Sequence, residues 1–176
     1  ASSNQQIIYK QQKVEPVAII GMSCRFPTNC NTPGLFWDFL SKKGNGMKEI
    51  PLSRFKYKEY YNHEIGVEIN TMYTNQGAFI DNIEYFDNER FDISKQEVYN
   101  MDPVQRIALE TAYECLQYSN NSSNVVGTYV GVCASSDFND VNTTKNVGPY
   151  TATGNANSII ANRISYILGL TGPSMS

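Results

Sequence analysis

One cysteine of this sequence lies where a nucleophile could be placed. Cys133 follows an apolar run within "GVCAS", Gly131 to Ser135, and this stretch resembles a loose nucleophile elbow. A nucleophilic enzyme also needs a base that takes the proton and donors that stabilise the oxyanion. The last glycine of the G-x-S-x-G pattern is missing, and no histidine follows Cys133 in the chain. We therefore expect a packed core thiol, with a small hydrolase or thiol enzyme that uses Cys133 as an alternative.

The other candidate groups have structural explanations of their own. His63 is the one histidine of the chain and stands beside Glu64 in a tyrosine-rich stretch, so we expect a surface side chain. Arg25 could bind an anion, but an ion pair or a hydrogen bond to backbone is the expected role. The segment "IIGMSCRFP" holds one glycine, which excludes a dinucleotide fingerprint and a phosphate loop. Four irregularly spaced cysteines without a CxxC pair do not indicate a zinc site. The residues alone predict a fold without catalytic machinery.

Composition limits the classes of partner. The chain has 14 Lys and Arg against 17 Asp and Glu, a net charge of −3, and no basic run longer than Lys42–Lys43. Such a sequence lacks the positive face that nucleic acids require, so we expect no nucleic-acid binding. No apolar stretch is long enough to span a bilayer, and no signal peptide stands at the start. We expect no membrane association, reduced thiols and a cytoplasmic location.

The first elements that the sequence predicts are a tail, a strand and a helix. Residues 1–14 are polar and aperiodic, so we interpret them as a tail or linker before a domain over residues 15–176. The apolar run Val17–Ile20 predicts a strand that is covered on both faces. "GLFWDFLSKKG" has apolar residues at helical spacing, with Gly44 as its stop. Residues 45–100 predict irregular structure with short strands or helical turns, held by aromatic packing.

The clearest predicted helix is "MDPVQRIALETAYECLQYS". Asp102 can cap it, Pro103 suits its first position, and Gln105 would complete a capping box with Asp102. Its apolar stripe consists of Val104, Ile107, Ala108, Ala112, Cys115 and Leu116.

The rest of the chain predicts a strand and a second, largely buried helix. "VGTYVGVCASSDF" is typical of a buried strand, in which Gly131 would allow a neighbouring backbone to approach. "TGNANSIIANRISYILG" predicts one helix, in which Asn155, Asn162 and Arg163 must find partners inside the protein, and Gly169 ends the helix in a left-handed conformation. The order strand, helix, helix, strand, helix indicates a layered α/β fold.

Five motifs together resemble one family. "EPVAIIGMSCRFP", "FWDFL", "MDPVQR", "YVGVCASSDF" and "TGNANSIIANRISYILGLTGPS" are similar, in order and spacing, to the N-terminal part of a β-ketoacyl synthase domain of a type I polyketide synthase. The resemblance implies a thiolase-like fold with layered αβαβα architecture that works as a homodimer. It also implies decarboxylative Claisen condensation, in which a cysteine takes the acyl chain from an acyl carrier protein and two histidines assist.

The resemblance carries over scaffold residues and no catalytic, cofactor-binding or metal-binding residue. The phrase "GPS" leads in this family to the elbow with the cysteine, and the chain stops at Ser176, before that nucleophile. Val17–Ile20 and Tyr129–Cys133 would lie in the central sheet, and the helix Asn155–Leu168 near the acyl pocket. Residues expected near the pocket or the dimer interface are Ser135, Ser136, Asp137, Asn155 and Ile159. Residues of structural motifs are Asp102, Pro103, Arg106, Asn162 and Arg163, and Arg106 is expected to pair within the protein.

The resemblance therefore implies the scaffold portion of a ketosynthase domain, a partial thiolase-like α/β fold truncated before the nucleophile elbow. We expect the chain alone to be inactive and to need the remainder of the domain. The parent enzyme would use substrates on the phosphopantetheine of an acyl carrier protein, with no cofactor in this chain. The alternative is a non-catalytic remnant, such as a gene fragment, or a partner that associates with an intact synthase. Without the second half of the domain, we expect the helix Asn155–Leu168 to expose a large apolar patch.

Overall fold

The computed structural model describes residues 15–64, 66, 69–119, 123–133 and 147–176. Its elements are helices, one 3₁₀ turn and four short strands, which form an antiparallel pair β1–β2 and a parallel pair β3–β4. The elements are α1 (Pro33–Ser41), β1 (Lys48–Glu49), η1 (Tyr57–Glu59), β2 (Gln76–Gly77), α2 (Lys95–Asn100), α3 (Pro103–Ser119), β3 (Thr128–Tyr129), α5 (Thr151–Asn155), α6 (Ile159–Ile167) and β4 (Ser174–Met175). Within these ranges no helix is long and apolar enough to cross a membrane.

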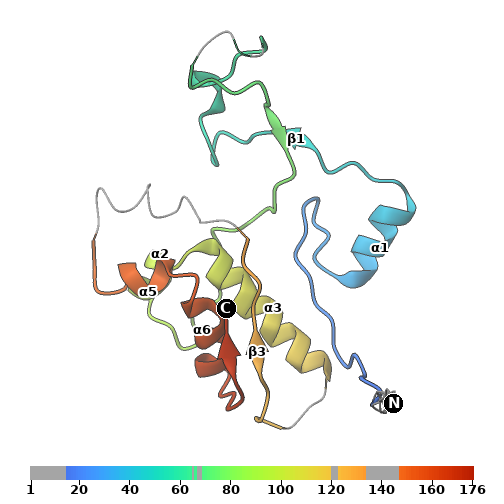
Figure 1. Cartoon of the computed structure of the whole chain (residues 1–176), viewed down its shortest axis with the longest axis vertical. Coiled ribbons are helices and arrows are strands. Elements are labelled where there is room, and N and C mark those ends of the chain that lie inside the picture. The colour runs from blue at the N-terminus through green and yellow to red at the C-terminus, as the bar shows by residue number, and fades with distance from the viewer. Residues whose placement is uncertain (1–14, 65, 67–68, 120–122, 134–146) are drawn as a thin grey trace, which may run out of the picture.

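The core lies where α3, α6, β3 and β4 meet (Figure 1). Helix α6 contacts α3 on one side and both strands of the parallel pair on another. The cluster of buried apolar side chains consists of Phe91, Ile93, Met101, Leu109, Ile160 and Ile164. The segment around β1 and β2 projects away from this core, as Figure 1 shows. The expected irregular structure of residues 45–100 is confirmed, and a stacked pair, Phe55 on Tyr60 at 5.3 Å between ring centroids, is part of the predicted aromatic packing.

The parallel pair is shorter than the sequence predicts. Thr128 pairs with Ser174 and Tyr129 with Met175, and the N–H of Val130 donates to the Met175 carbonyl at 2.9 Å. The strand expected at Tyr129–Cys133 therefore has regular pairing only at its start. The expected close approach at Gly131 is wrong for the part of the chain that the structure describes, because a Cβ added there would meet none of its atoms within 4 Å.

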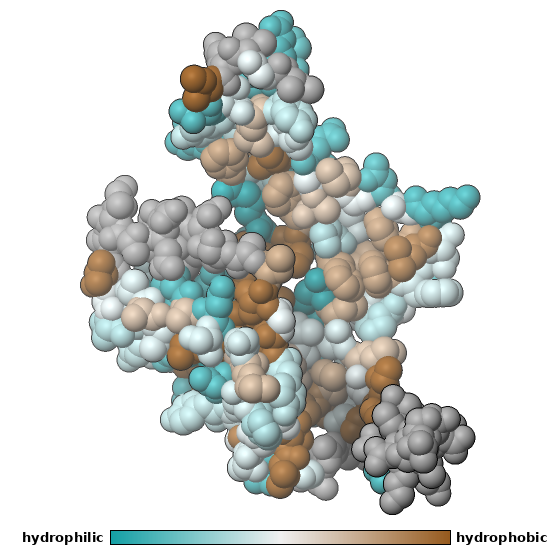
Figure 2. Space-filling model, in the orientation of Figure 1, coloured by the Kyte–Doolittle hydropathy of each residue, from teal (hydrophilic) through white to brown (hydrophobic). Residues whose placement is uncertain are grey.

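The predicted strand at Val17–Ile20 does not form. Its residues have no strand assignment, and Val17 is 92% and Ile19 81% exposed. An apolar run forms a strand only beside a partner strand, because its N–H and C=O groups must be paired. No described residue pairs with this run, so it stays outside any sheet. Hydrophobic side chains reach the surface in several separate places of the molecule (Figure 2).

The start of α3 confirms one part of the capping prediction and contradicts the other. The Asp102 carboxylate accepts from the N–H of Val104 at 2.7 Å, and Pro103 is the first residue of the helix. The capping box is wrong, because the N–H of Asp102 donates to the Gly154 carbonyl at 2.9 Å and not to Gln105. Helix α1 also forms as predicted, capped by Thr32, but it ends at Ser41, before Gly44.

The helix expected within "TGNANSIIANRISYILG", residues 153–169, is broken in two. α5 ends at Asn155, Ala156 is extended with ψ 122°, and α6 begins at Ile159. The Ala156 carbonyl accepts from the Gln105 side chain at 3.3 Å, which holds the break against α3. Gly169 has φ +65° and ends the segment in the left-handed conformation, as predicted. The expected apolar patch on this helix is wrong, since Ile160 and Ile164 are buried.

The segment before α1 is fastened to α3 by Glu114. The Ser23 hydroxyl donates to the Glu114 carboxylate at 2.8 Å, and the Arg25 guanidinium forms an ion pair with the same group. This confirms the structural role that we expected for Arg25. The hydrogen bond from Arg25 lowers the pKa of Glu114. One turn earlier, burial raises the pKa of Glu110.

These two carboxyl groups act on stability in opposite directions. The lowered pKa of Glu114 adds stability above its unfolded-state pKa, and this is lost as pH falls through the folded-state pKa. The raised pKa of Glu110 adds stability below its unfolded-state pKa, and this is lost as pH rises through the folded-state pKa. We predict that at pH 7 Glu114→Gln lowers the free energy of unfolding and Glu110→Gln raises it. Urea denaturation between pH 7 and pH 3 measures this; both differences should shrink toward pH 3, and changes of equal sign would contradict the assignment.

Candidate functional site

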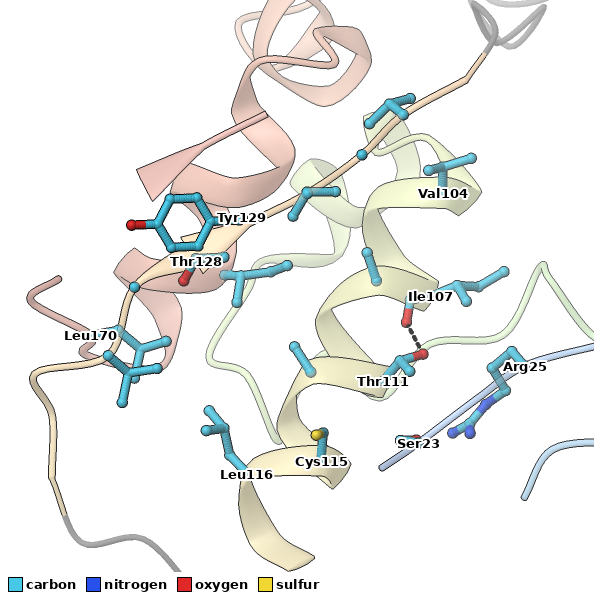
Figure 3. A pocket seen from close by; sticks show the side chains of 18 of the residues that line it. Ser23, Arg25, Val104, Ile107, Thr111, Cys115, Leu116, Thr128, Tyr129 and Leu170 are labelled. Carbon is cyan, nitrogen blue, oxygen red and sulfur yellow. Dashed lines mark hydrogen bonds between the residues drawn. The ribbon is translucent and has the colours of Figure 1, made fainter. Parts of the chain in front are cut away.

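An open groove of about 870 Å³ runs between α3 and the extended segment 126–133. Figure 3 shows the two walls, with the side chains of α3 facing those of β3 and its extension. The α3 wall contains Thr111 and the apolar stripe that the sequence predicts, Val104, Ile107, Ala108, Ala112, Cys115 and Leu116. The stripe therefore exists, but it faces this groove, and the fully covered side of α3 carries Gln105, Arg106 and Leu109.

The strand wall of the groove carries an unpaired edge. In a parallel ladder, alternate residues direct their N–H and C=O groups to opposite edges. The N–H of Thr128 donates to the Pro173 carbonyl, just before β4, at 2.7 Å, and the N–H of Val130 donates to the Met175 carbonyl at 2.9 Å. The backbone groups of Gly127, Tyr129 and Gly131 therefore turn the other way, and no described strand pairs with them. Further β-strands can pair with such an unpaired edge and pack on the apolar wall beside it.

Cys133 lies at the end of this wall and is exposed, so the expected packed thiol is wrong. The ladder ends before it, and no neighbouring strand covers it among the described residues. The described residues that line the groove include no Asp, Glu or His. His63 is 78% exposed by its side chain and contacts Glu64, as a surface residue does. The groove therefore supplies no general base for Cys133, and the thiol-enzyme alternative gains no support here.

A buried polar network lies on the other side of α3. Arg163 is 8% exposed; its Nε donates to the Gln105 Oε1 at 2.9 Å and its Nη1 to Glu97 at 2.5 Å. The Gln105 amide in turn donates to the carbonyls of Thr153 at 3.0 Å and Ala156 at 3.3 Å. The prediction that Arg163 finds partners inside the protein is confirmed. The network joins α2, α3 and the break between α5 and α6.

The other predicted residues are not gathered at one point. Arg106 pairs within the protein as expected, with its Nη1 donating to the Glu84 carbonyl at 3.0 Å, and burial lowers its pKa. Asn155 is half-buried and donates to the Thr151 carbonyl at 2.6 Å. Asn162 is exposed, so its expected interior partner is wrong; it accepts from the Ser174 hydroxyl at 2.7 Å. Ile159 is half-buried at the start of α6. Ser135, Ser136 and Asp137 lie outside the described residues.

The sequence interpretation misses the role of Gln105 and Glu97. It places Gln105 in a cap, although this residue stands four positions before Leu109 on the covered side of the helix. A long polar side chain at that position, with a predicted buried Arg elsewhere, is the signal that could have identified the pair.

Comparison with known proteins decides the family. The family model described as Beta-ketoacyl synthase, N-terminal domain, matches residues 14–176. The chain belongs to the β-ketoacyl synthase family. It is 37% identical over 172 residues to a mycocerosic acid synthase-like polyketide synthase of Mycolicibacterium smegmatis, covering 94% of this chain and 8% of that protein. It is also 38% identical over 170 residues to the polyketide synthase-nonribosomal peptide synthetase pyiS of Pyricularia grisea, covering 92% of this chain and 4% of that protein.

Solved ketosynthase structures share the fold of this β-ketoacyl synthase chain. The ketosynthase from module 6 of the bacillaene synthase of Bacillus subtilis 168 matches with a TM-score of 0.67 and 30% identity, over 89% of this chain and 25% of that one. The oxazolomycin ketosynthase domain of Streptomyces albus JA3453 matches with a TM-score of 0.76 at 23% identity, over 89% and 28% of the two chains. The predicted partial thiolase-like α/β fold is confirmed. The chain spans about a quarter of the length of these structures.

The buried network gives a stability prediction for this ketosynthase segment. Arg163→Met leaves Glu97 and Gln105 without their shared partner, and breaking a buried ion pair from one side costs about 3–5 kcal/mol of unfolding free energy. Lys48→Met is the matched control, because Lys48 pairs with Asp81 at 2.7 Å on the surface, and such pairs contribute little. Urea denaturation should show a large loss for the first variant and none for the second. Equal effects would contradict the role of the network.

Proposed function

We propose that residues 15–176 are the N-terminal scaffold of a polyketide synthase ketosynthase domain. In its intact form this domain catalyses decarboxylative Claisen condensation of acyl and malonyl-type thioesters, in polyketide or fatty-acid-type biosynthesis. The match of the family over residues 14–176 supports the assignment, as do relatives that are polyketide synthases. The chain spans between 4% and 11% of the length of the curated relatives it matches, so the condensing activity belongs to the whole domain in this proposal.

The observation that carries the proposal is the groove with its unpaired edge. Its α3 wall is apolar, its strand wall offers the backbone groups of Gly127, Tyr129 and Gly131, and its described lining holds no acid or His. A surface of this kind fits β-strands better than it fits a reacting substrate, because strands would satisfy both the edge and the apolar wall. We infer that the remainder of the ketosynthase domain occupies it. This chain then contributes positioning and burial, and the remainder contributes the cysteine and both histidines.

The partners follow from the same assignment. An acyl carrier protein would deliver substrates on its phosphopantetheine arm, and this chain would need no cofactor of its own. The intact domain would be a homodimer, with Ser135, Ser136 and Asp137 near the interface and with Asn155 and Ile159 near the acyl pocket. We also propose a cytoplasmic location.

A second function is favoured by the openness of the groove in this chain. A non-catalytic remnant could use the same apolar wall and edge to associate with an intact synthase. In that case the chain would bind a synthase without adding to its activity. The two functions differ in whether a supplied remainder gives condensation.

We predict that the isolated chain forms no ketoacyl product from acyl and malonyl carrier-protein thioesters, because the groove as the structure describes it places no base beside Cys133. The same chain joined to the residues encoded directly after Ser176 should form it, as measured by mass spectrometry of the carrier-bound product. In the joined protein, Ala112→Glu places a charge on the apolar wall and should abolish product formation. The matched control is Gln117→Glu, on the exposed side of α3, which should leave product formation unchanged. Product from the isolated chain, or a fused protein without activity, would contradict the proposal.

A further inference from the structure

The first turn of α6 is capped by a residue from outside the helix. Ser158, at the N-cap position, has a helical conformation and makes no capping bond with its side chain. The N–H groups of Ile159 and Ile160 donate to the carbonyls of Ala156 and Asn157. The next N–H, that of Ala161, donates to the Ser176 hydroxyl at 3.1 Å. Ser176 therefore satisfies a helix N–H group that would otherwise lack a partner.

A second bond joins the same two elements. The Ser174 hydroxyl donates to Oδ1 of Asn162 at 2.7 Å. The backbone of β4 is also paired with β3 in parallel register. β4 is thus held on one edge by backbone hydrogen bonds and against α6 by two side-chain hydrogen bonds, one on each side of Met175.

Helix α6, which takes part in both bonds, is itself held by buried hydrogen bonds. Arg163 follows Asn162 directly and is buried in the network with Gln105 and Glu97. The Ser165 hydroxyl, two residues further along α6, donates to the Thr128 hydroxyl of β3 at 2.9 Å, and both residues are buried. α6 is therefore fixed to α3 and to β3, and it can hold the end of β4 in one place.

These bonds hold the carboxyl end of β4, and the direction of the strands gives this end its importance. β3 and β4 are parallel, so their carboxyl ends lie at the same edge of the sheet. In open α/β sheets, ligands and reacting groups lie outside the carboxyl ends of parallel strands. Ser176 stands directly after Met175 at this end.

We infer that Ser176 and Asn162 are positioning residues for the condensation reaction. They fix the direction in which the backbone leaves β4, and so the position of the reacting groups that follow. The inference rests on the proposed function, in which the cysteine nucleophile comes after Ser176. Neither side chain touches substrate; each acts through the backbone that it holds.

The test uses the ketosynthase domain that contains this segment and compares variants in pairs. Ser176→Ala removes the hydroxyl and Ser176→Thr keeps it; Asn162→Leu removes the acceptor oxygen and Asn162→Asp keeps it. The matched control is Thr171→Val, because the Thr171 hydroxyl also donates to a backbone carbonyl, that of Asn124 at 3.1 Å, before β4 begins. The measurements are kcat and KM for condensation, the rate of acylation of the nucleophile, and hydrogen exchange at the Ala161 amide.

We expect Ser176→Ala and Asn162→Leu to lower kcat and the acylation rate about tenfold or more, with KM little changed, since small displacements of reacting groups are costly. Ser176→Thr and Asn162→Asp should restore most of the rate, and the Ala161 amide should exchange faster only in Ser176→Ala. Unchanged kcat in Ser176→Ala, or an equal loss in Ser176→Thr or in Thr171→Val, would overturn the inference. An inactive wild-type domain contradicts the proposed function instead, and equal Ala161 exchange in wild type and Ser176→Ala then overturns this inference by itself.

Discussion

The core of this segment depends on the hydrogen bonds and the ion pair that the buried Arg163 guanidinium forms. It is buried between helices and is satisfied by the amide oxygen of Gln105 and the carboxylate of Glu97. A buried cation is stable only when its donors are paired, so the positions of α2, α3 and α6 are fixed relative to one another. Gln105 uses its other end to hold the carbonyls of Thr153 and Ala156, so the break between α5 and α6 has the same origin.

With α3 and α6 fixed, the strand pair β3–β4 is covered on one side and open on the other. One side packs on α6, where Ser165 bonds to Thr128 and where Ile160 and Ile164 are buried. On the other side, the apolar stripe of α3 and the edge at Tyr129 face an open groove. The covered side positions the end of β4, and the open side is suited to receive further strands. Both properties agree with the N-terminal part of a ketosynthase domain, the family to which the chain belongs.

Local chemistry makes parts of this structure predictable from the sequence. The cap at Asp102, the helix start at Pro103 and the left-handed Gly169 each follow from a residue type and its immediate neighbours. The failures concern groups whose partners are distant in sequence. Val17–Ile20 has the composition of a strand, but no described strand pairs with it. Cys133 has the apolar context of a core thiol, but no described strand covers it on its side of the ladder. The capping interpretation of Gln105 fails because its partners lie near residues 153–163.

The central claim is that the groove over α3 receives the remainder of the domain, and the exposed thiol of Cys133 at the end of its strand wall reports on this most directly. The measurement is the alkylation rate of Cys133, read by mass spectrometry, in the isolated chain and in the intact domain, with the buried thiol of Cys30 as the internal control. The account predicts rapid alkylation of Cys133 in the isolated chain, strong protection in the intact domain, and slow alkylation of Cys30 in both. Equal alkylation of Cys133 in the two proteins would contradict it.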